Sequence, residues 1–475
     1  MADKTPYQTY LAEVFGEDLE KFMHHPPVSD FIRVNTLRTS VEEVRRILSD
    51  YGFETEVACR DTGAIRILKA PHDPTLCLHH YAGFFVKQGL SSQIPPYLLA
   101  PQPGETVLDM CAAPGSKTTQ IASMMCQKGK LYANDLSAKR MIPLAARLDG
   151  TRVSNTILLN HPGERLTQWM APMFDRILAD VPCSGLGVSD SLNENQYRYE
   201  KCKSRVSFYE LQYKLLLSAC KMLKVGGRVV YSTCSLNPSE DECVVDDIVS
   251  RLPMKILPVP DMDGIRLSPG KISWMDRRFD PSLSLTRRVV PWENDTRGFY
   301  VAVLEKQAEL PQRHHYEPEL TESRPTLPPD DEDVQDILNN IEYYYGIPKK
   351  LFDHHRFLIN SRAAFLLDES WTHSLPSVYR AGLCLAKRRG RMWRLSTACI
   401  QKFSPYISKN KLTVNEAQMR EMATTGWLKG LNFEPESPYP VLEYPPLGCL
   451  ASTYAYDEGI YWKRPTQFYL PGKEN

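Results

Sequence analysis

Between residues 97 and 305 the chain alternates short apolar stretches with stretches of helical spacing. This alternation constrains the fold strongly, because short buried strands separated by helices form a parallel sheet that is covered on both faces. The predicted strands are TVLDMC (106–111), KLYANDL (130–136), NTILLN (155–160), FDRILADV (174–181), GRVVYSTC (227–234) and RGFYVAVLEK (297–306). The predicted helices include KTTQIASMM (117–125) and AKRMIPLAARL (138–148). We therefore predict an α/β core over residues 96–306.

A smaller α/β unit is predicted before this core, over residues 1–95. Its expected elements are a helix over 40–52, capped by Ser40 or Thr39, and strands over 31–37 and 82–89. Pro95 and Pro96 are expected to mark the boundary between the two units.

After the core, residues 307–335 are polar and proline-rich and contain an acidic run, so we predict a linker there. Residues 336–475 contain many aromatic residues and short strand-like pieces, among them GRMWRLST (390–397) and YPVLEYPPLGCLAST (439–453). This pattern predicts a mostly β accessory domain.

Composition excludes several classes of protein. Lys plus Arg and Asp plus Glu number 57 each, so any nucleic-acid surface must be a local cluster of cations rather than a net excess. No apolar run approaches the roughly 20 residues of a membrane helix, and the first residues lack the pattern of a signal peptide. We therefore expect no membrane association, and we expect the 12 cysteines to be reduced thiols. The sequence contains no CxxC motif with a second CxxC or an HxxxH partner, so we expect no structural zinc site.

The first motif with chemical meaning is DMCAAPGSKTTQ (109–120), in which a strand ends, a turn follows and a helix begins. Its small residues let a ligand approach the backbone, and the start of the helix offers free N–H groups. Asp135 ends the next strand, where a carboxylate accepts hydrogen bonds from ribose hydroxyls. The spacing is not GxGxxG, which disfavours a dinucleotide. A tight turn without a ligand is the alternative interpretation.

Two further motifs place cysteines just after strands: LADVPCSGLG (178–187) contains Asp180 and Cys183, and YSTCSLNPSEDE (231–242) contains Cys234. A single cysteine in such a position is more often a packed, unreactive thiol. Two of them on one parallel sheet face the same crevice, which favours a thiolate nucleophile.

The segment AKRRGRMWR (386–394) holds five cationic residues and one Trp within nine positions. This interleaving fits phosphate contact combined with base stacking. A solvated β-hairpin explains it equally well.

The combination of DMCAAPGSKTT, DVPCSG and YSTCS resembles the NOL/NOP/Sun (NSUN) family of RNA 5-methylcytosine methyltransferases. FIRVNTL, FFVKQGLSSQIPP and RGFYVAVLEK also look like that family, so the resemblance covers roughly residues 28–305. It implies a Rossmann-like domain that binds S-adenosyl-L-methionine. The residues that it implies for the cofactor are Cys111, Ala112, Ala113, Pro114, Gly115, Ser116, Lys117, Asp135 and Asp180.

The resemblance also implies a catalytic set. Cys234 would attack carbon 6 of cytosine, and Cys183 would assist removal of the carbon 5 proton and release of the enzyme. Asp180 would hydrogen-bond the ring near N3, and Lys117 would lie close to the reacting groups. The target base must be flipped or unpaired to reach such a pocket.

The C-terminal part resembles the PUA-like domain of the bacterial 16S rRNA branch, while the spelling of the motifs also resembles the eukaryotic tRNA branch. The expected partner is therefore RNA, either tRNA or small-subunit rRNA. The protein is expected to be monomeric and intracellular, in the cytoplasm, the nucleus or nucleolus, or an organelle.

Two departures from the family favour an alternative. Pro162 stands where the family usually has an Asp that contacts the adenine of the cofactor, and proline offers no side-chain acceptor. Residues 186–196 are acidic and polar where the family often has a basic segment. The alternative is a non-catalytic RNA-binding or ribosome-assembly factor. A small-molecule or protein methyltransferase is disfavoured, because those reactions need no pair of strand-end cysteines.

Overall fold

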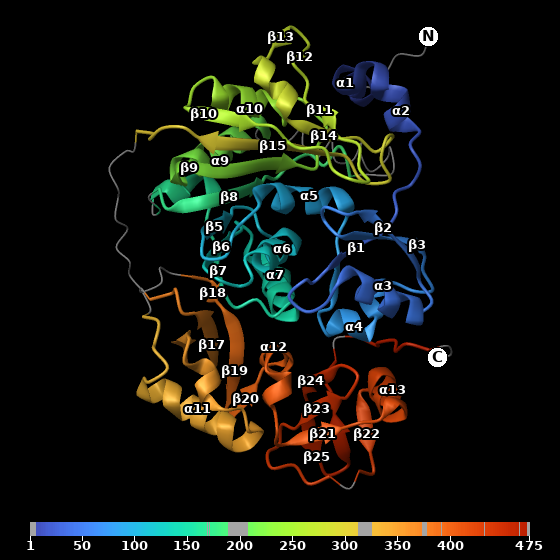
Figure 1. The fold of residues 1–475 in the computed structure, drawn as a ribbon, viewed down its shortest axis with the longest axis vertical. Helices are drawn as coiled ribbons and strands as arrows, with labels where there is room; N and C mark the ends of the chain where they lie inside the picture. Colours follow the sequence, from blue (N-terminus) through green and yellow to red (C-terminus); the bar gives the residue numbers. More distant parts are fainter. Residues whose placement is uncertain are drawn as a thin grey trace.

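The computed structural model of the chain describes residues 6–168, 170, 172–188, 208–311, 325–372, 378–390, 392–431, 433–464 and 466–472. Most of the polar segment 186–196, and Arg391 of the basic motif, lie outside the described residues. The molecule is elongated: helix α1 lies at one end, the central sheet in the middle and the last strands at the other end (Figure 1).

The central sheet confirms the predicted α/β fold and adds antiparallel strands to it. Its strands run in the order β11-β14-β15-β9-β8-β5-β6-β7-β18, and β10 also pairs with β15. The five parallel strands are β5 (Thr106–Asp109), β6 (Lys130–Asn134), β7 (Thr156–Leu159), β8 (Phe174–Asp180) and β9 (Leu223–Thr233). The antiparallel strands are β10 (Met254–Leu257), β11 (Ser268–Pro269), β14 (Arg287–Val289), β15 (Phe299–Lys306) and β18 (Arg380–Ala381).

The expectation of a purely parallel sheet is therefore wrong at its edges. RGFYVAVLEK forms β15, which pairs antiparallel with β9. A strand's own apolar pattern does not reveal its direction, because a central strand is buried on both faces in either case.

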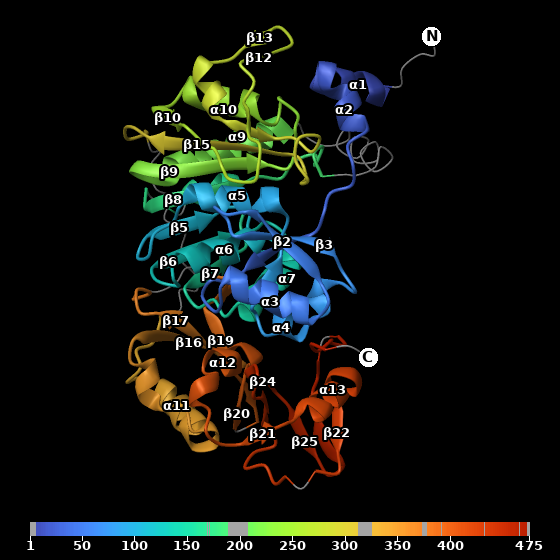
Figure 2. The ribbon, with the colours of Figure 1, turned by 45° about the vertical axis from the view of Figure 1, so that its right-hand side comes forward.

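Helices cover both faces of the sheet, as Figures 1 and 2 show. One face carries α5 (Leu90–Leu99), α6 (Ser116–Met124) and α7 (Ala138–Gly150), and the other carries α9 (Phe208–Met222) and α10 (Glu242–Val249). Successive strand residues alternate between the two cores: Leu108 packs with α9 and Val107 with α6.

Pro95 and Pro96 do not mark a boundary, because both lie inside α5. Both side chains are buried against the sheet. Packing of this apolar helix thus overrides the usual tendency of proline to end one.

The first unit is an antiparallel sheet in the order β2-β3-β1-β4. Its strands are β1 (Phe31–Val34), β2 (Glu54–Cys59), β3 (Ala64–Lys69) and β4 (Phe85–Lys87), and its helices are α3 (Val41–Asp50) and α4 (Leu78–Tyr81). The predicted cap of α3 is confirmed, because the Ser40 side chain accepts a hydrogen bond from the backbone N–H of Glu43.

The first two helices, α1 (Pro6–Phe15) and α2 (Leu19–Met23), do not pack on this first sheet. Leu11 and Phe22 form a core with Leu236 and Val290 of the central region. The start of the chain therefore covers the segment that follows β9.

The C-terminal region is rich in strands and also contains α11 (Glu332–Tyr345), α12 (Thr397–Lys402) and α13 (Glu416–Thr425). Helix α11 begins inside the segment predicted as a linker, with Asp331 as its N-cap. One sheet contains β16 (His355–Ile359), β17 (Ala363–Asp368), β19 (Leu383–Arg389) and β20 (Met392–Leu395). The others contain β21 (Lys411–Thr413), β23 (Val441–Tyr444) and β24 (Gly448–Ser452), and β22 (Trp427–Lys429), β25 (Tyr454–Tyr456) and β26 (Gly459–Tyr461).

Among the described residues, no helix combines the length and the apolar character that crossing a membrane requires.

Candidate active site

Two free thiols lie against each other at the carboxyl edge of the central sheet. Cys234 follows β9 directly, and Cys183 lies in the loop after β8. These strands are parallel neighbours, with Asp180 opposite Ser232, so both loops leave the sheet at the same edge. The Sγ atoms are 2.8 Å apart, and both side chains are partly buried. The structure thus brings together the two cysteines that the sequence singled out.

An ion pair lies beside the thiols. Lys117 Nζ, in the first turn of α6, is 2.7 Å from Asp180 Oδ2, and the two side chains are only 14% and 25% exposed. Ser232 Oγ donates a hydrogen bond of 2.8 Å to the other carboxylate oxygen of Asp180. Lys117 Nζ also lies 5.3 Å from the centre of the Phe299 ring. The lysine and the carboxylate are therefore held in one orientation, and a thiol lies near them.

A cavity of about 520 Å³ opens onto these groups. Lys117, Asp180 and Cys234 line its inner side. Its other walls come from the first sheet, from the start of α5 and from the start of β15, and they include Phe31, Gln88, Ser91, Gly298 and Phe299. The volume lies in the range of small-molecule sites, and Cys234 is part of the wall of this cavity.

Glu240 ties the two cysteine loops together, and sequence reasoning missed it. Its carboxylate accepts hydrogen bonds from the backbone N–H of Ser184 (2.8 Å), Ser184 Oγ (2.5 Å), Ser235 Oγ (3.0 Å) and Gln212 Nε2 (3.2 Å). Ser184 and Ser235 each follow one of the two cysteines in the chain. Glu240 is only 3% exposed, so this carboxylate fixes the relative position of the two thiols.

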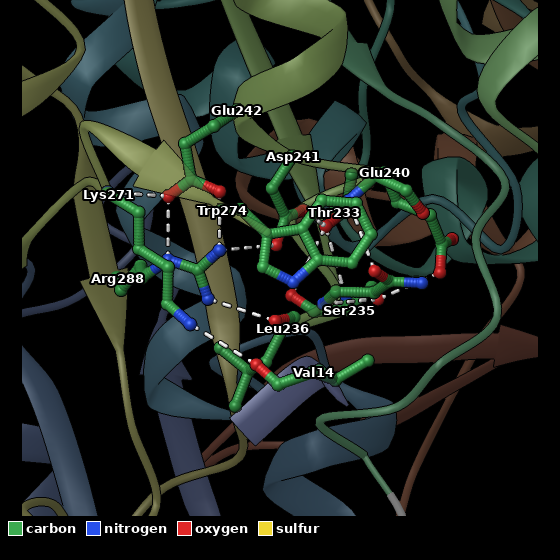
Figure 3. A network of polar contacts seen from close by, with 12 residues as sticks. Val14, Thr233, Ser235, Leu236, Glu240, Asp241, Glu242, Lys271, Trp274 and Arg288 are labelled. Carbon is green, nitrogen blue, oxygen red and sulfur yellow. Dashed lines mark hydrogen bonds and ion pairs between the residues drawn. The ribbon is translucent and has the colours of Figure 1, made fainter. Parts of the chain in front are cut away.

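A second buried network lies next to Glu240 in the chain (Figure 3). Arg288 Nε donates to Glu242 Oε1 at 2.7 Å, and Arg288 also forms an ion pair of 3.4 Å with Asp241. Thr233 Oγ1, one residue before Cys234, donates to Asp241 Oδ1 at 2.6 Å. Arg288 Nη1 donates to the Leu236 carbonyl at 2.9 Å. These contacts hold both sides of the Cys234 loop to β14.

The contact between the two thiols and their burial affect the protonation of Cys183. The hydrogen bond with Cys234, and then burial, raise the pKa of the Cys183 thiol well above its usual range. The contact between the two sulfur atoms and burial therefore favour the protonated thiol at Cys183, and either sulfur can donate the hydrogen bond between them. The site therefore holds a protonated thiol at Cys183 in direct contact with the sulfur of Cys234.

The turn at residues 111–117 lies at the carboxyl end of β5 and leads into α6. The N-cap of α6 is Gly115, with φ of +104°, a conformation that favours glycine. The first N–H groups of a helix lack partners within it, so this turn offers donors to an anionic or polar ligand.

Asp135 lies just after β6 and is 4% exposed. It accepts hydrogen bonds from the backbone N–H of Ala113 (3.2 Å) and of Ser137 (2.9 Å). Arg140, half exposed, lies 3.3 Å from Asp135 Oδ2. The carboxylate is thus joined to the 111–117 turn, and Arg140 lies against its Oδ2.

Pro162 lies in the loop after β7, where its side chain offers no acceptor. The preceding residue, His161, is fixed to β6, because its backbone N–H donates to Asn134 Oδ1 at 3.1 Å.

Cys111, in the turn after β5, has its pKa raised well above its usual range, chiefly by burial. Burial therefore favours the protonated thiol of Cys111 at neutral pH.

Comparisons with known proteins show what this chain is similar to. The family model described as 16S rRNA methyltransferase RsmB/F matches residues 96–305. The chain is 35% identical over 315 residues to the 26S rRNA (cytosine-C(5))-methyltransferase nsun-1 of Caenorhabditis elegans, covering 63% of this chain and 46% of that relative. It is 34% identical over 297 residues to the tRNA (cytosine(49)-C(5))-methyltransferase of Pyrococcus abyssi, covering 61% of this chain and 93% of that relative.

The chain thus spans about half of the length of the worm relative and nearly all of the archaeal one. Among solved structures, a methyltransferase homologue from Pyrococcus horikoshii is 28% identical with a TM-score of 0.54, over 64% of this chain and 96% of that chain.

Proposed function

This chain belongs to the NOL/NOP/Sun family of RNA (cytosine-C5)-methyltransferases, and we propose that it methylates carbon 5 of a cytosine in RNA, with S-adenosyl-L-methionine as the methyl donor. One observation carries the proposal. Cys234, whose thiol lies 2.8 Å from that of Cys183, lines one cavity together with the ion pair of Lys117 and Asp180. Methyl transfer to an atom that is already nucleophilic needs no such pair, whereas carbon 5 of cytosine needs a thiolate to activate it.

The residues present fit S-adenosyl-L-methionine, which when bound supplies an electrophilic methyl group. The turn at 111–117 offers backbone donors at the start of α6, and Asp135 offers a buried carboxylate at the end of the neighbouring strand. Asp180, at the end of β8, would close the site on the side of the cavity. These are the residues that we propose hold the cofactor.

In the reaction that we propose, the Cys234 thiolate forms a bond to carbon 6 of the cytosine, and carbon 5 thereby becomes nucleophilic. Asp180 accepts a hydrogen bond from the ring near N3, and Lys117 balances the charge of that carboxylate. The hydrogen bonds from Ser232 and to Lys117 keep Asp180 in place while the adduct exists.

Cys183 completes the cycle. The interaction with Cys234 is the largest cause of its raised pKa, and the adduct removes that interaction. We propose that Cys183 then releases its proton to solvent. Its thiolate takes the carbon 5 proton after methylation, the bond between Cys234 and carbon 6 breaks, and the Cys234 thiolate is restored. One proton is released per turnover, and Cys183 ends as the thiol with which it began.

Two variants test these roles. Cys234→Ala should abolish methylation of RNA by labelled S-adenosyl-L-methionine. Cys183→Ala should accumulate a covalent protein–RNA adduct, which denaturing gel electrophoresis detects. Cys220→Ala, a buried cysteine of α9 away from the thiol pair, is the matched control and should retain activity. Full activity in Cys234→Ala would refute its role as the nucleophile.

We propose tRNA or rRNA as the substrate, since relatives are named for both. Residues 1–95 and the PUA-like residues 336–475 would hold the RNA, and the protein would act as an intracellular monomer. Bisulfite sequencing of RNA from cells that lack the protein identifies the substrate and the position, and sedimentation measures the oligomeric state.

A second candidate is a non-catalytic RNA-binding or assembly factor, which Pro162 favours because it offers no acceptor beside the proposed cofactor site. Calorimetric titration with S-adenosyl-L-methionine separates the two. The absence of binding at millimolar cofactor would favour the second candidate.

A further inference from the structure

The sheet β22–β26–β25 lies at the end of the molecule farthest from α1 (Figures 1 and 2). Its inner side is apolar. Leu428, Ala455 and Ile460 point inward, where they pack with Trp462 and Phe468. Successive residues of a strand point to opposite sides, so the neighbours of these inner residues form the other face of the sheet.

That other face is aromatic. We call Trp427, Tyr454, Tyr456 and Tyr461 the aromatic face. Tyr461 lies directly opposite both Trp427 and Tyr454 on the flanking strands, so three rings form a row across the sheet. The ring centres of Trp427 and Tyr461 are 4.9 Å apart, and those of Tyr454 and Tyr461 are 6.4 Å apart. Tyr456 is 55% exposed, and the other three rings are partly exposed.

Cations continue this row. Arg394 of β20 places its guanidinium carbon 4.2 Å from the centre of the Tyr454 ring, and its Nε donates to Ser452 Oγ at 2.9 Å. Lys387 lies opposite Arg394 in the β19–β20 hairpin, and Arg389 lies two residues further along, so the three side chains share one side. Lys387 and Arg389 are exposed, and neither forms an ion pair with any described residue.

The charges within this sheet lie at the ends of the ring row. Lys429 lies 5.8 Å from the Trp427 ring centre and 3.7 Å from Glu458, a contact between two exposed side chains. Within the three strands and the turn that joins β25 to β26, the acidic residues are Asp457 and Glu458, both in the turn. The ring row itself therefore borders Arg394 on one side and Lys429 on the other.

We propose that the aromatic face binds an unpaired segment of RNA, whose bases stack on Trp427, Tyr461 and Tyr454 while its phosphates follow Arg394, Arg389 and Lys387. Exposed rings on adjacent strands, bordered by cations, offer both components of single-strand binding. A duplex is a poorer ligand, because its bases are already stacked and only its backbone is accessible. The choice of RNA as the ligand rests on the proposed function, and the inference adds where and in what form the RNA is held.

The test measures binding of a fluorescent oligouridylate to the full-length protein, with an RNA duplex as the second probe. Trp427→Ala and Tyr461→Ala should each weaken binding of the oligouridylate about tenfold. Trp427→Phe, which keeps a ring, should retain most of the affinity and shows that the site is intact. Tyr343→Ala removes a ring on α11 that is 67% exposed, and this matched control should bind normally.

The dependence of RNA affinity on salt concentration tests whether the cations contact phosphates. Arg389→Gln should weaken binding and reduce the slope of log affinity against log salt by about 0.7, the value for one phosphate contact to a single strand. Equal binding by wild type and by the Trp427→Ala, Tyr461→Ala double variant would overturn the proposal, and so would a preference for the duplex.

These outcomes are independent of the methylation assay. Cys234→Ala should lose methylation and still bind the oligouridylate through the aromatic face. If the protein methylates RNA but its binding of the oligouridylate does not depend on Trp427 or Tyr461, this inference alone is refuted. Ring-dependent binding without methylation of any RNA would refute the proposed function alone.

Discussion

Asp109 is a buried carboxylic acid behind the proposed site. It is 1% exposed, and Oδ2 accepts a hydrogen bond of 2.7 Å from Thr118 Oγ1. The other oxygen has no partner among the described residues. Burial, and then the charge of Asp180, raise the pKa of Asp109 to about 7. The folded protein therefore keeps a proton here that the unfolded chain loses at a pH of about 4.

This proton predicts a particular pH dependence. Between pH of about 4 and 7 the unfolded state binds fewer protons than the folded state, so the free energy of unfolding falls as pH rises through that window. From pH of about 5 to 7 the decline from this group is roughly 2 kcal/mol, at 1.36 kcal/mol for each pKa unit, because Asp109 is half ionised at the upper end. Asp109→Asn should lack this decline, and urea unfolding at pH of about 5 and 8 measures it.

Asp353→Asn, at an exposed position, serves as the control and should keep the wild-type dependence on pH. An unchanged decline in Asp109→Asn would show that Asp109 is ionised in the folded protein at neutral pH.

Glu240 supports a prediction about catalysis. Glu240→Gln places an amide N–H₂ among donors from Ser184, Ser235 and Gln212, so the two cysteine loops should separate. We expect kcat to fall roughly 10- to 100-fold, since displacement of reacting groups by about 1 Å has this effect. The KM for S-adenosyl-L-methionine should stay unchanged.

The same variant should alter the dependence of thiol alkylation on pH, because that dependence reports the contact between Cys183 and Cys234. Glu436→Gln, at an exposed position in the C-terminal region, should change neither quantity. Wild-type kcat in Glu240→Gln would exclude a positioning role.

Some residues of the candidate site could be identified from the sequence, and others could not. Cys183, Cys234 and Asp180 were identified because motifs at strand ends bring side chains to one edge of the sheet. Glu240 and Ser232 lie within or beside the same motifs, but their roles depend on contacts with residues far away in the chain, such as Ser184 and Asp180. A sequence pattern does not contain such contacts.

At the scale of elements, apolar strands were predictable and their directions were not. The patterns over 106–111 and 174–181 gave β5 and β8 because buried parallel strands are apolar throughout. The antiparallel pairing of β15 depends on the whole path of the chain after β9. Helix α5 shows the same limit, because its packing places Pro95 inside a helix.

Two glycines hold one junction of elements together. Gly187, in the loop after Cys183, donates its N–H to the Cys234 carbonyl at 3.0 Å. Gly298, just before β15, donates to the Gly187 carbonyl at 2.7 Å. A Cβ atom on Gly187 would lie 2.7 Å from the Gly298 oxygen and 2.8 Å from its Cα. Only glycine therefore fits where the loop after Cys183 meets the start of β15.

Gly187→Ala should consequently push this loop away from β15. We expect a loss of about 1–3 kcal/mol in the free energy of unfolding, as for other overpacked sites, together with reduced methylation. Gly150→Ala, where a Cβ meets no atom within 4 Å, is the control and should be neutral. Chemical denaturation of both variants makes the comparison, and equal stability of the two would contradict the steric argument.

At the scale of the whole molecule, contacts between distant segments join the C-terminal region to the rest. Strand β18 pairs with β7 at the edge of the central sheet, and Leu78 of α4 packs with Trp462 and Phe468. The sequence indicated a separate accessory domain from its composition, but composition does not show that two of its residues extend the central sheet. The limits proposed for the domains thus describe stretches of the chain rather than units that are independent in space.

The ion pair of Arg380 and Asp149 lies at this junction and gives the last prediction. Arg380, in β18, is 14% exposed, and its Nη1 donates to Asp149 Oδ2 at 2.9 Å. A second hydrogen bond joins Arg380 Nη2 to Asp149 Oδ1. Because the pair is largely shielded from water and bidentate, Arg380→Ala should lower the free energy of unfolding by about 1–2 kcal/mol.

Arg380→Ala should destabilise the junction between the C-terminal region and the central sheet, and it should leave the hydrophobic cores on either side of that junction almost unchanged. Differential scanning calorimetry should show the C-terminal region unfolding earlier in Arg380→Ala than in wild type, with the remaining transition almost unchanged. Arg46→Ala removes an ion pair with Glu43 in which the arginine is 65% exposed, and this control should change stability by less than about 1 kcal/mol. If both variants lose the same small amount, β18 is held by its backbone pairing alone, and the Arg380–Asp149 pair contributes no more than an exposed one.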